Sequence, residues 1–192
     1  MITHLNGKLV EKNPTNVVIE CGGVGYYAKI SLTTFSALGS TEQLKLFTQQ
    51  IVREDANLLY GFATTEERDV FNLLLTVSGI GANTAILMLS SLQPADIAQA
   101  IQTEDVVTIQ SIKGIGVKTA QRVILDLKDK MVKLEWSTHS NIFVGNNTIR
   151  FDALTALISL GFDKKAAEKA IDKIATGSET VEEMIKGALK IL

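Results

Sequence analysis

The chain has 192 residues, of which 46% are hydrophobic and 21% are charged, and its formal net charge is −2. This length suits one large domain or roughly two to three small ones, and the near-neutral charge excludes a globally basic nucleic-acid-binding protein, so any phosphate-binding patch must be local. The one cysteine, Cys21, allows no intrachain disulfide. Because the first ten residues also carry no apolar run typical of a signal peptide, we expect a cytoplasmic protein.

Residues 1–63 have the pattern of a small β-domain. Runs such as NVVIEC and YYAKISL alternate or are rich in β-branched residues, and turn signals at Asn13-Pro14 and at residues 22–25 separate them. The runs QLKLFTQQIVRE and NLLYGF are expected to pair as a hairpin whose tip is Glu54-Asp55-Ala56. About five short strands in this length predict a closed or half-closed β-barrel, because closure removes exposed strand edges.

Residues 64–135 have the pattern of an all-helical domain. Thr64 or Thr65 is expected to cap a first helix, and Pro94 is expected in the first turn of another. Residues 70–95 carry no charge, which raises the possibility of a membrane span, but polar residues and glycines interrupt the run. We therefore expect short helices buried in the core of a soluble domain.

The helical zone repeats itself at a spacing of 35 residues, so that LLTVSGIGANTAILML (74–89) aligns with IQSIKGIGVKTAQRVI (109–124). The matched pairs are Leu74 and Ile109, Val77 and Ile112, Gly79 and Gly114, Ile80 and Ile115, Gly81 and Gly116, Thr84 and Thr119, and Ala85 and Ala120. One shared Gly-x-Gly is a weak signal. Seven matched positions in one register within one chain are a strong one.

Each copy has the chemistry of a phosphate-binding turn. Glycines permit positive φ and close approach of another backbone. The helix that opens after the second glycine presents unpaired N–H groups at its positive end, where anions bind. The middle isoleucines are expected to pin the turns to the core. This is the helix-hairpin-helix motif, whose contacts from backbone to phosphate do not read sequence.

The two copies differ in charge. The second has Lys118 and Arg122, four residues apart on one helix face, where the first has Asn83 and Leu87. We therefore predict that the second copy binds phosphate more strongly. The candidate DNA-binding residues are Gly79, Ile80, Gly81, Asn83, Thr84, Gly114, Ile115, Gly116, Lys118, Thr119 and Arg122.

The stretch SIKGIGVKTAQR also suggests a nucleotide-binding loop. Such a loop needs G-x-x-x-x-G-K-[ST] after a buried strand. Here Val117 stands where a glycine should precede Lys118, and Ile112 stands where the first glycine should be. These departures favour the backbone of a nucleic acid over a nucleotide as the source of the phosphate.

The last part of the chain divides into a linker and a small helical domain. Residues 136–148 are rich in Ser, Thr, Asn and Gly, which is typical of a linker. Residues 149–192 are helical again, punctuated by Leu160-Gly161-Phe162 and Gly177-Ser178. Thr180 and Glu183 predict a capping box. We expect a three-helix bundle too small to be strongly stable alone.

The sequence contains no catalytic constellation. His4 and His139 lie in different zones, and one cysteine with two histidines gives no zinc-binding spacing. The acidic pairs Glu66-Glu67 and Glu182-Glu183 stand at expected helix starts, where the helix dipole explains them. We therefore expect no metal, no cofactor, and no ATPase or nuclease activity of the chain by itself.

The order of these parts resembles the RuvA family over the whole chain: a barrel with the hairpin sequence VREDANLLYGF, tandem helix-hairpin-helix motifs, a polar linker and a three-helix tail. The resemblance implies an OB-fold-like barrel, a central all-α domain and a C-terminal bundle similar to the ubiquitin-associated fold. It implies a homotetramer, or an octamer on DNA, that binds four-way (Holliday) junctions without sequence specificity and holds them open.

The same resemblance implies partners and special residues. Residues 149–192 would recruit the hexameric RuvB motor, which hydrolyses ATP during branch migration in recombination and repair, and the RuvC resolvase could join the complex. Leu160-Gly161-Phe162 would contact the motor. Glu54 and Asp55 would form an acidic pin that repels phosphates and helps to separate strands. Asn83 departs from the family, which often has a basic residue at this turn.

Two other functions stay open at this point. A repair nuclease or glycosylase can also carry helix-hairpin-helix motifs, but it would need a nucleophilic lysine or metal-binding carboxylates beside the hairpin, and no such arrangement stands out. The second alternative function is a protein-interaction module, which would bind ubiquitin-like partners through residues 149–192.

Overall fold

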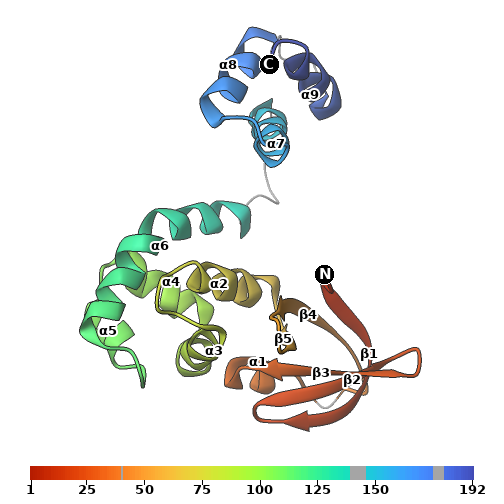
Figure 1. The fold of residues 1–192 in the computed structure, drawn as a ribbon, viewed down its shortest axis with the longest axis vertical. Coiled ribbons are helices and arrows are strands. Elements are labelled where there is room, and N and C mark those ends of the chain that lie inside the picture. Colours follow the sequence, from red (N-terminus) through yellow and green to blue (C-terminus); the bar gives the residue numbers. More distant parts are fainter. Residues whose placement is uncertain (40, 139–145, 175–179) are drawn as a thin grey trace. The chain divides into compact units, whose positions relative to one another are not determined.

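The computed structural model describes residues 1–39, 41–138, 146–174 and 180–192 (Figure 1). The chain forms two compact units, Met1–Thr138 and His139–Leu192. The first unit holds a β-barrel followed by helices, and the second holds helices alone. Among the described residues, no helix is both long and apolar enough to cross a membrane.

The β-barrel at the N-terminus closes in the order β1-β2-β3-β5-β4. Its strands are β1 (His4–Asn13), β2 (Asn16–Cys21), β3 (Val24–Ile30), β4 (Gln43–Val52) and β5 (Asn57–Phe62). Neighbouring strands are antiparallel except β3 and β5, which run parallel. Alternate side chains such as Val17, Ile19 and Leu46 are fully buried inside. The expected OB-fold-like barrel is confirmed.

A short helix, α1 (Leu32–Ala37), follows β3. The sequence pattern had suggested that the strand run YYAKISL continues to Leu32, but β3 ends at Ile30. Ser31 caps the new helix, because its side-chain oxygen accepts the backbone N–H of Thr34 at 2.9 Å. Six residues with two threonines give no helical periodicity, so only the cap marks this helix.

The remaining helices of the first unit are α2 (Thr65–Leu75), α3 (Ala82–Ser91), α4 (Pro94–Gln102), α5 (Val106–Gln110) and α6 (Val117–Thr138). Thr64 caps α2 by accepting the backbone N–H of Glu67 at 3.2 Å. Pro94 stands in the first turn of α4, where its missing N–H needs no partner. Both helix starts agree with the sequence prediction.

Strand β5 belongs to the hydrophobic core of the helices, while the interior of the barrel forms a separate cluster. Tyr60 and Phe62 of β5 pack on Phe71 of α2, with ring centroids 5.2 and 4.9 Å apart. All three side chains are buried in the same cluster as α3 to α6. Burying each such ring stabilises the fold by about 1.5–3 kcal/mol. The barrel and the helices of residues 1–138 are therefore joined by shared packing.

The second unit is a three-helix bundle of α7 (Asn146–Ser159), α8 (Lys164–Ile174) and α9 (Val181–Leu189). Its core contains Leu157, Ile171 and Met184. The capping box of Thr180 and Glu183 forms as the sequence predicts. The helices α6 and α7 extend into the two ends of segment 136–148, and residues 139–145 lie outside the described residues, as do His139 and the Gly177-Ser178 break.

Candidate nucleic-acid interface

The two repeated segments fold into turns with the same hydrogen bonds. In the first, between α2 and α3, the Ile80 N–H donates to the Val77 carbonyl at 3.1 Å. In the second, between α5 and α6, the Ile115 N–H donates to the Ile112 carbonyl at 3.0 Å. The repeat spacing of 35 therefore holds in the backbone as well as in the sequence.

The glycines of each turn have two different roles. Gly79 and Gly114 adopt φ of +93° and +88°, a conformation that side chains disfavour. Gly81 and Gly116 have no positive φ, and a Cβ placed on either would meet no atom within 4 Å. The chain itself therefore does not require glycine at these second positions, and the space beside them is open to another molecule.

Buried side chains hold both turns to the core. Ile80 and Ile115 are each 5% exposed, and the matched alanines Ala85 and Ala120 are fully buried. The expected pinning by the middle isoleucines is observed in both copies. Each turn therefore presents its backbone on a rigid support.

The start of α3 offers unpaired backbone donors. Gly81 caps this helix without a side-chain hydrogen bond, and its carbonyl accepts the Ala85 N–H at 2.9 Å. The carbonyl of Gly116 accepts the Ala120 N–H at the same distance, at the start of α6. The N–H groups of a first helical turn have no intrahelical partner and attract anions.

The side chains beside the turns are asymmetric. Lys118 and Arg122 are exposed on α6, and neither forms an ion pair with a described residue. Thr119 is half-buried between them. In the first copy Asn83 is exposed and Thr84 is half-buried. Only the second turn therefore carries cations in its own repeat.

Lys130 brings a cation to the first turn from a distant part of the chain. Its Nζ donates to Thr76 Oγ1 at 3.1 Å. Thr76 caps the C-terminus of α2, three residues before Gly79. No local sequence motif marks Lys130, because its partner is 54 residues away.

The second hairpin is braced at its entrance by two acidic residues. Asp105 caps α5 by accepting the Thr108 N–H at 3.0 Å and the Thr108 hydroxyl at 2.6 Å, and these hydrogen bonds lower the pKa of Asp105. Glu104, at φ +56°, pairs with Lys128 of α6, which lowers the pKa of Glu104. Both carboxylates therefore support the short helix α5.

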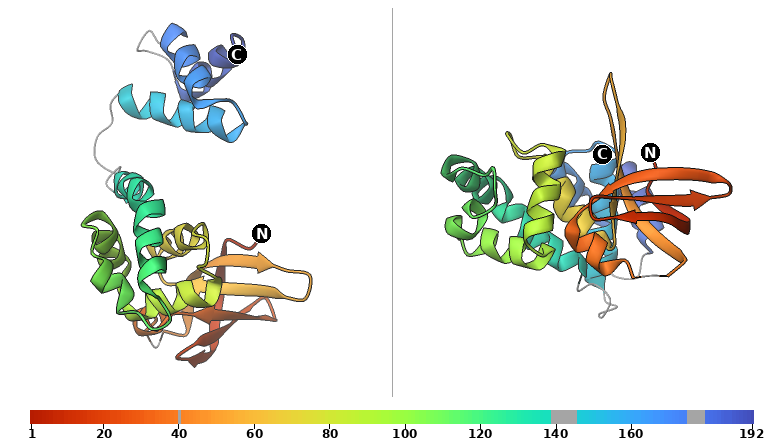
Figure 2. Two further views of the ribbon diagram at one scale, coloured as in Figure 1. Left: turned by 60° about the vertical axis from the view of Figure 1, so that its left-hand side comes forward. Right: turned by 90° about the horizontal axis from the view of Figure 1, so that it is seen from below.

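Glu54 and Asp55 lie at the tip of the β4–β5 hairpin, where both are exposed. The Arg53 N–H donates to the Ala56 carbonyl at 2.7 Å and closes the turn. The hairpin tip expected from the sequence is therefore confirmed. In the right-hand view of Figure 2, this hairpin and the turn that precedes α3 project on the same side of the unit.

Known families match nearly the whole chain. Residues 1–61 match the RuvA N terminal domain, residues 71–129 a SAM-like helix-hairpin-helix tandem, and residues 149–192 the RuvA C-terminal domain. The chain belongs to the RuvA family. The tandem helix-hairpin-helix prediction is thereby confirmed, as is the resemblance drawn from the order of the modules.

Curated relatives agree over their full length. The chain is 53% identical to the Holliday junction branch migration complex subunit RuvA of Christiangramia forsetii and 54% identical to that of Flavobacterium psychrophilum. It is 50% identical to that of Cytophaga hutchinsonii. In each comparison the alignment covers 100% of both chains.

In this RuvA-family chain, the turn after α7 separates the three candidate partner-binding residues. Gly161 has φ +97°, and its N–H donates to Ile158 while the Phe162 N–H donates to Leu157. This is a Schellman motif that ends the helix. Leu160 is 62% exposed, whereas Phe162 packs against the core of the bundle. Leu160 alone of the three offers a large apolar side chain to solvent.

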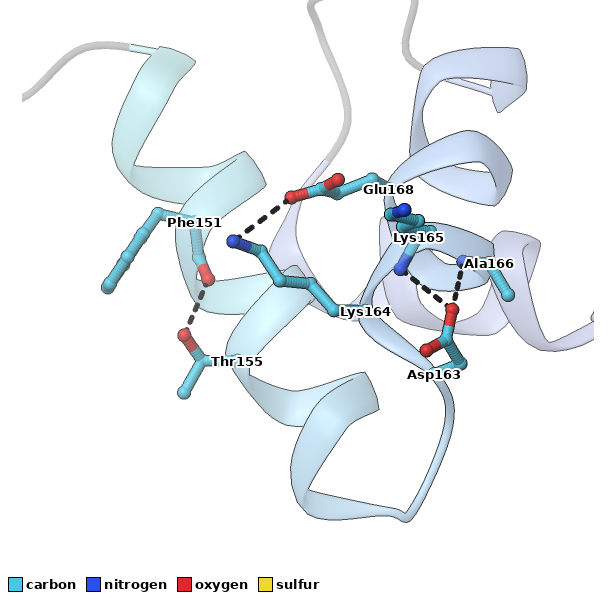
Figure 3. Close-up of polar contacts among 7 residues, drawn as sticks. All are labelled: Phe151, Thr155, Asp163, Lys164, Lys165, Ala166 and Glu168. Atoms are coloured by element: carbon cyan, nitrogen blue, oxygen red, sulfur yellow. Dashed lines mark hydrogen bonds and ion pairs between the residues drawn. The ribbon is translucent and has the colours of Figure 1, made fainter.

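A groove of about 310 Å³ lies between α7 and α8. It is lined by Arg150, Phe151, Leu154, Glu168, Ile171 and Asp172. Phe151 is 66% exposed, and Figure 3 shows its ring directed away from α8. In the same view Lys164 points toward Glu168, at 3.6 Å, and Asp163 accepts the N–H groups that begin α8. No sequence motif marks this groove, because its lining comes from two helices.

Metal binding has no support in the described part of the chain. Among those residues, no three His, Cys, Asp or Glu side chains are grouped closely enough to hold a metal ion.

Proposed function

We propose that this chain binds four-way DNA junctions without reading their sequence, holds them open, and recruits an ATP-hydrolysing motor. The observation that carries the proposal is the matched pair of turns, each with a positive-φ glycine and a buried isoleucine, in one compact unit with an acidic hairpin. The name of the relatives, Holliday junction branch migration complex subunit, supports the junction as the ligand.

Phosphate binding would combine backbone and side-chain donors. A Cβ at Gly81 or Gly116 would meet no atom within 4 Å, so a phosphate oxygen could approach the backbone at these helix starts closely. Lys118 and Arg122 are exposed beside the second turn. Such contacts go to the DNA backbone, so binding would be independent of base sequence.

The first turn would draw its positive charge from Lys130. Its ammonium lies at the end of α2 and is 3.1 Å from Thr76 Oγ1. This placement compensates for Asn83, which stands where Lys118 stands in the second copy. The first turn would then have one cation beside it and the second turn two, Lys118 and Arg122, so the second remains the stronger phosphate site.

The acidic hairpin would act by repulsion. Glu54 and Asp55 are exposed at its tip, on the side to which the first turn projects. Carboxylates near phosphates raise the energy of a stacked crossover and favour separated arms. This is the role proposed for the acidic pin.

Affinity would come from several copies of the chain. Residues 64–135 contain seven Lys or Arg and nine Asp or Glu, which is a net charge of −2. One copy therefore attracts DNA weakly. A homotetramer, or two tetramers around one junction, links several such sites and raises their effective concentration.

Recruitment of the motor is proposed for residues 149–192. The exposed Leu160 and the groove beside Phe151 offer apolar surface on this unit. The RuvB hexamer would dock there and supply ATP hydrolysis, and the RuvC resolvase could join the complex. The chain itself would be a non-catalytic, cytoplasmic subunit.

Comparison of a four-way junction with a linear duplex of the same sequence tests the proposal. In a band-shift titration we expect the junction to bind at least about tenfold more tightly, which is about 1.4 kcal/mol. Equal affinity would contradict junction recognition. A nicking assay on junction and lesion substrates, read with and without alkali, addresses the alternative. A repair nuclease would cut a strand directly and a glycosylase would leave an abasic site that alkali breaks, whereas the proposed scaffold would do neither.

A further inference from the structure

The barrel holds the first helix-hairpin-helix at the end opposite its turn. The Thr33 hydroxyl of α1 donates to the Leu89 carbonyl of α3 at 2.6 Å, and the Leu32 N–H donates to Ser90 Oγ at 3.0 Å. These bonds satisfy groups that the start of α1 and the end of α3 would otherwise leave unpaired. The helix α1 is therefore tied to the C-terminus of α3.

The same helix is tied to α2 through a buried carboxylate. Glu67 is 1% exposed, and one of its oxygens accepts the Ser31 hydroxyl. The other accepts the Thr34 hydroxyl at 2.6 Å and the Ala63 N–H at 3.3 Å. No described Lys, Arg or His forms an ion pair with Glu67. Its burial therefore depends on these three neutral donors.

These contacts make up the α1 clamp, which consists of Ser31, Leu32, Thr33 and Thr34 on the barrel side and Glu67, Leu89 and Ser90 on the helical side. Residues of the helical side come from both helices of the first hairpin, near the start of α2 and the end of α3. The turn at Gly79–Gly81 joins the other ends of these helices. The clamp thus joins α2 and α3 at the end of the first helix-hairpin-helix that lies opposite its phosphate-binding turn.

The clamp restrains the angle between the barrel and the first helix-hairpin-helix in addition to the apolar packing. Phe71 lies one helical turn after Glu67 and packs on Tyr60 and Phe62. The free energy of burying these rings follows mainly the area removed from water, which changes little with a small rotation of α2. Hydrogen bonds require short distances and near-linear geometry. The clamp therefore restrains small rotations that the aromatic contact penalises less.

We propose that Glu67 and Thr33 are positioning residues that fix the first phosphate-binding turn relative to the acidic hairpin, and thereby set the preference for a four-way junction over linear duplex. The barrel carries both the clamp and the hairpin with Glu54 and Asp55, so the orientation of α2 and α3 sets the distance from turn to tip. This inference rests on the proposed junction-binding function.

A merely stabilising role predicts something different. Loss of folded protein lowers the apparent affinity for junction and duplex by the same factor, so their ratio stays constant. If α2 and α3 lose their fixed orientation, each phosphate-binding turn can still bind phosphate. Only the fit of the first turn and the acidic hairpin tip to a four-way junction changes. The ratio of the two affinities therefore separates positioning from stability.

The test uses the full chain with four single substitutions, two at Thr33, one at Glu67 and one at Glu66. Thr33→Val is nearly isosteric and removes the hydroxyl donor to Leu89, whereas Thr33→Ser keeps that donor. Glu67→Gln keeps the volume but replaces one acceptor oxygen by a donor. Glu66→Gln, at the neighbouring exposed position of the same helical turn, is the control. Junction and duplex affinities are measured for each by fluorescence anisotropy.

In Thr33→Val and Glu67→Gln we expect the junction-to-duplex ratio to fall about tenfold while duplex affinity changes less than about threefold. Thr33→Ser and Glu66→Gln keep the ratio of the unmodified chain. If Glu67→Gln does not fold, the Thr33 pair decides the question. An unchanged ratio in Thr33→Val overturns the clamp proposal alone. Absence of junction preference in the unmodified chain instead overturns the proposed function, and the clamp proposal with it.

Discussion

Gly79 and Gly114 lie 35 residues apart and share a left-handed backbone, with φ of +93° and +88°. Two residues further on, Gly81 and Gly116 have no positive φ. A Cβ at any of the four positions would meet no atom within 4 Å, so only the backbone angle separates the pairs, and the fold itself requires glycine at the first pair alone. This difference can be tested by alanine substitution.

We predict that Gly79→Ala and Gly114→Ala each destabilise the chain by roughly 1–2 kcal/mol, because a Cβ is strained at positive φ. Gly81→Ala and Gly116→Ala should cost less than about 1 kcal/mol, since only the preference for glycine at a helix start is lost. Urea denaturation measures these differences. Equal destabilisation at all four positions would contradict the division of roles.

The same four variants should rank differently in DNA binding. Gly81→Ala and Gly116→Ala place a methyl group in the space where a phosphate is proposed, so we expect about tenfold weaker junction binding per site, or about 1.4 kcal/mol. Anisotropy titration at a temperature where each variant is folded measures this. Junction affinities equal to that of the unmodified chain would contradict the proposed contact between phosphate and the backbone at Gly81 and Gly116.

Lys118 should contribute more to binding than Asn83. Junction affinity is expected to fall steeply with salt, because each phosphate contact releases counterions. Lys118→Ala should reduce the slope of log affinity against log salt by about 0.9, and Asn83→Ala should leave the slope unchanged. The proposed ranking of the two turns is wrong if Asn83→Ala weakens binding as much as Lys118→Ala does. A junction affinity that does not change with salt concentration would contradict phosphate contacts at both turns.

Lys130 should behave as the cation of the first turn. Lys130→Ala is expected to lower the salt slope by about 0.9. Lys128→Ala is the matched control, because Lys128 lies on the same helix but pairs with Glu104. Adding Asn83→Lys to Lys130→Ala should restore the slope, since it supplies a charge at the same turn. If the salt slope is not restored, Lys130 does not act as the cation of the first turn.

Neutralising the acidic tip should strengthen binding to linear duplex. In Glu54→Gln with Asp55→Asn, two negative charges are lost without a change of shape, and duplex affinity is expected to rise by up to about tenfold at low salt. Glu11→Gln, an exposed change on the same barrel, is the control. No rise in the double variant would argue that the tip does not face DNA.

Leu160 should affect recruitment of the motor and not DNA binding. Leu160→Asp changes a side chain that is 62% exposed, so we expect less than about 0.5 kcal/mol of destabilisation. Junction affinity should stay the same, while co-purification of RuvB on the junction should be lost. Ser159→Asp is the control at the neighbouring exposed position. If Leu160→Asp still recruits RuvB, the docking surface does not depend on this turn.

Local chemistry explains why much of the fold could be predicted. Thr64, Pro94 and Thr180 act at helix starts through bonds to their own neighbours, so their roles are visible in the sequence. The hairpin tip at Glu54 and Asp55 follows from two alternating runs of strand residues. The glycine turns repeat within one chain, which makes their pattern detectable without any structure.

Other features depend on contacts between distant segments. The segment of α1 has no helical periodicity, and in the sequence the place of Glu67 at a helix start is accounted for by the helix dipole alone. The structure shows instead that Glu67 is buried and bonded to Ser31 and Thr34, which are 36 and 33 residues away. Lys130 likewise meets Thr76 across 54 residues. No spacing rule within one element links such pairs.

The sequence by itself determined the modules, their order and the chemistry of the two turns, because capping, strand alternation and glycine φ act over a few residues. Only the tertiary structure decided that strand β5 of the barrel packs in the core of the helices, that α1 is hydrogen-bonded to both α2 and α3, and that Lys130 of α6 meets Thr76 at the end of α2. Hydrogen bonds and packing depend on distance in space, which the chain sets only once its segments have folded together.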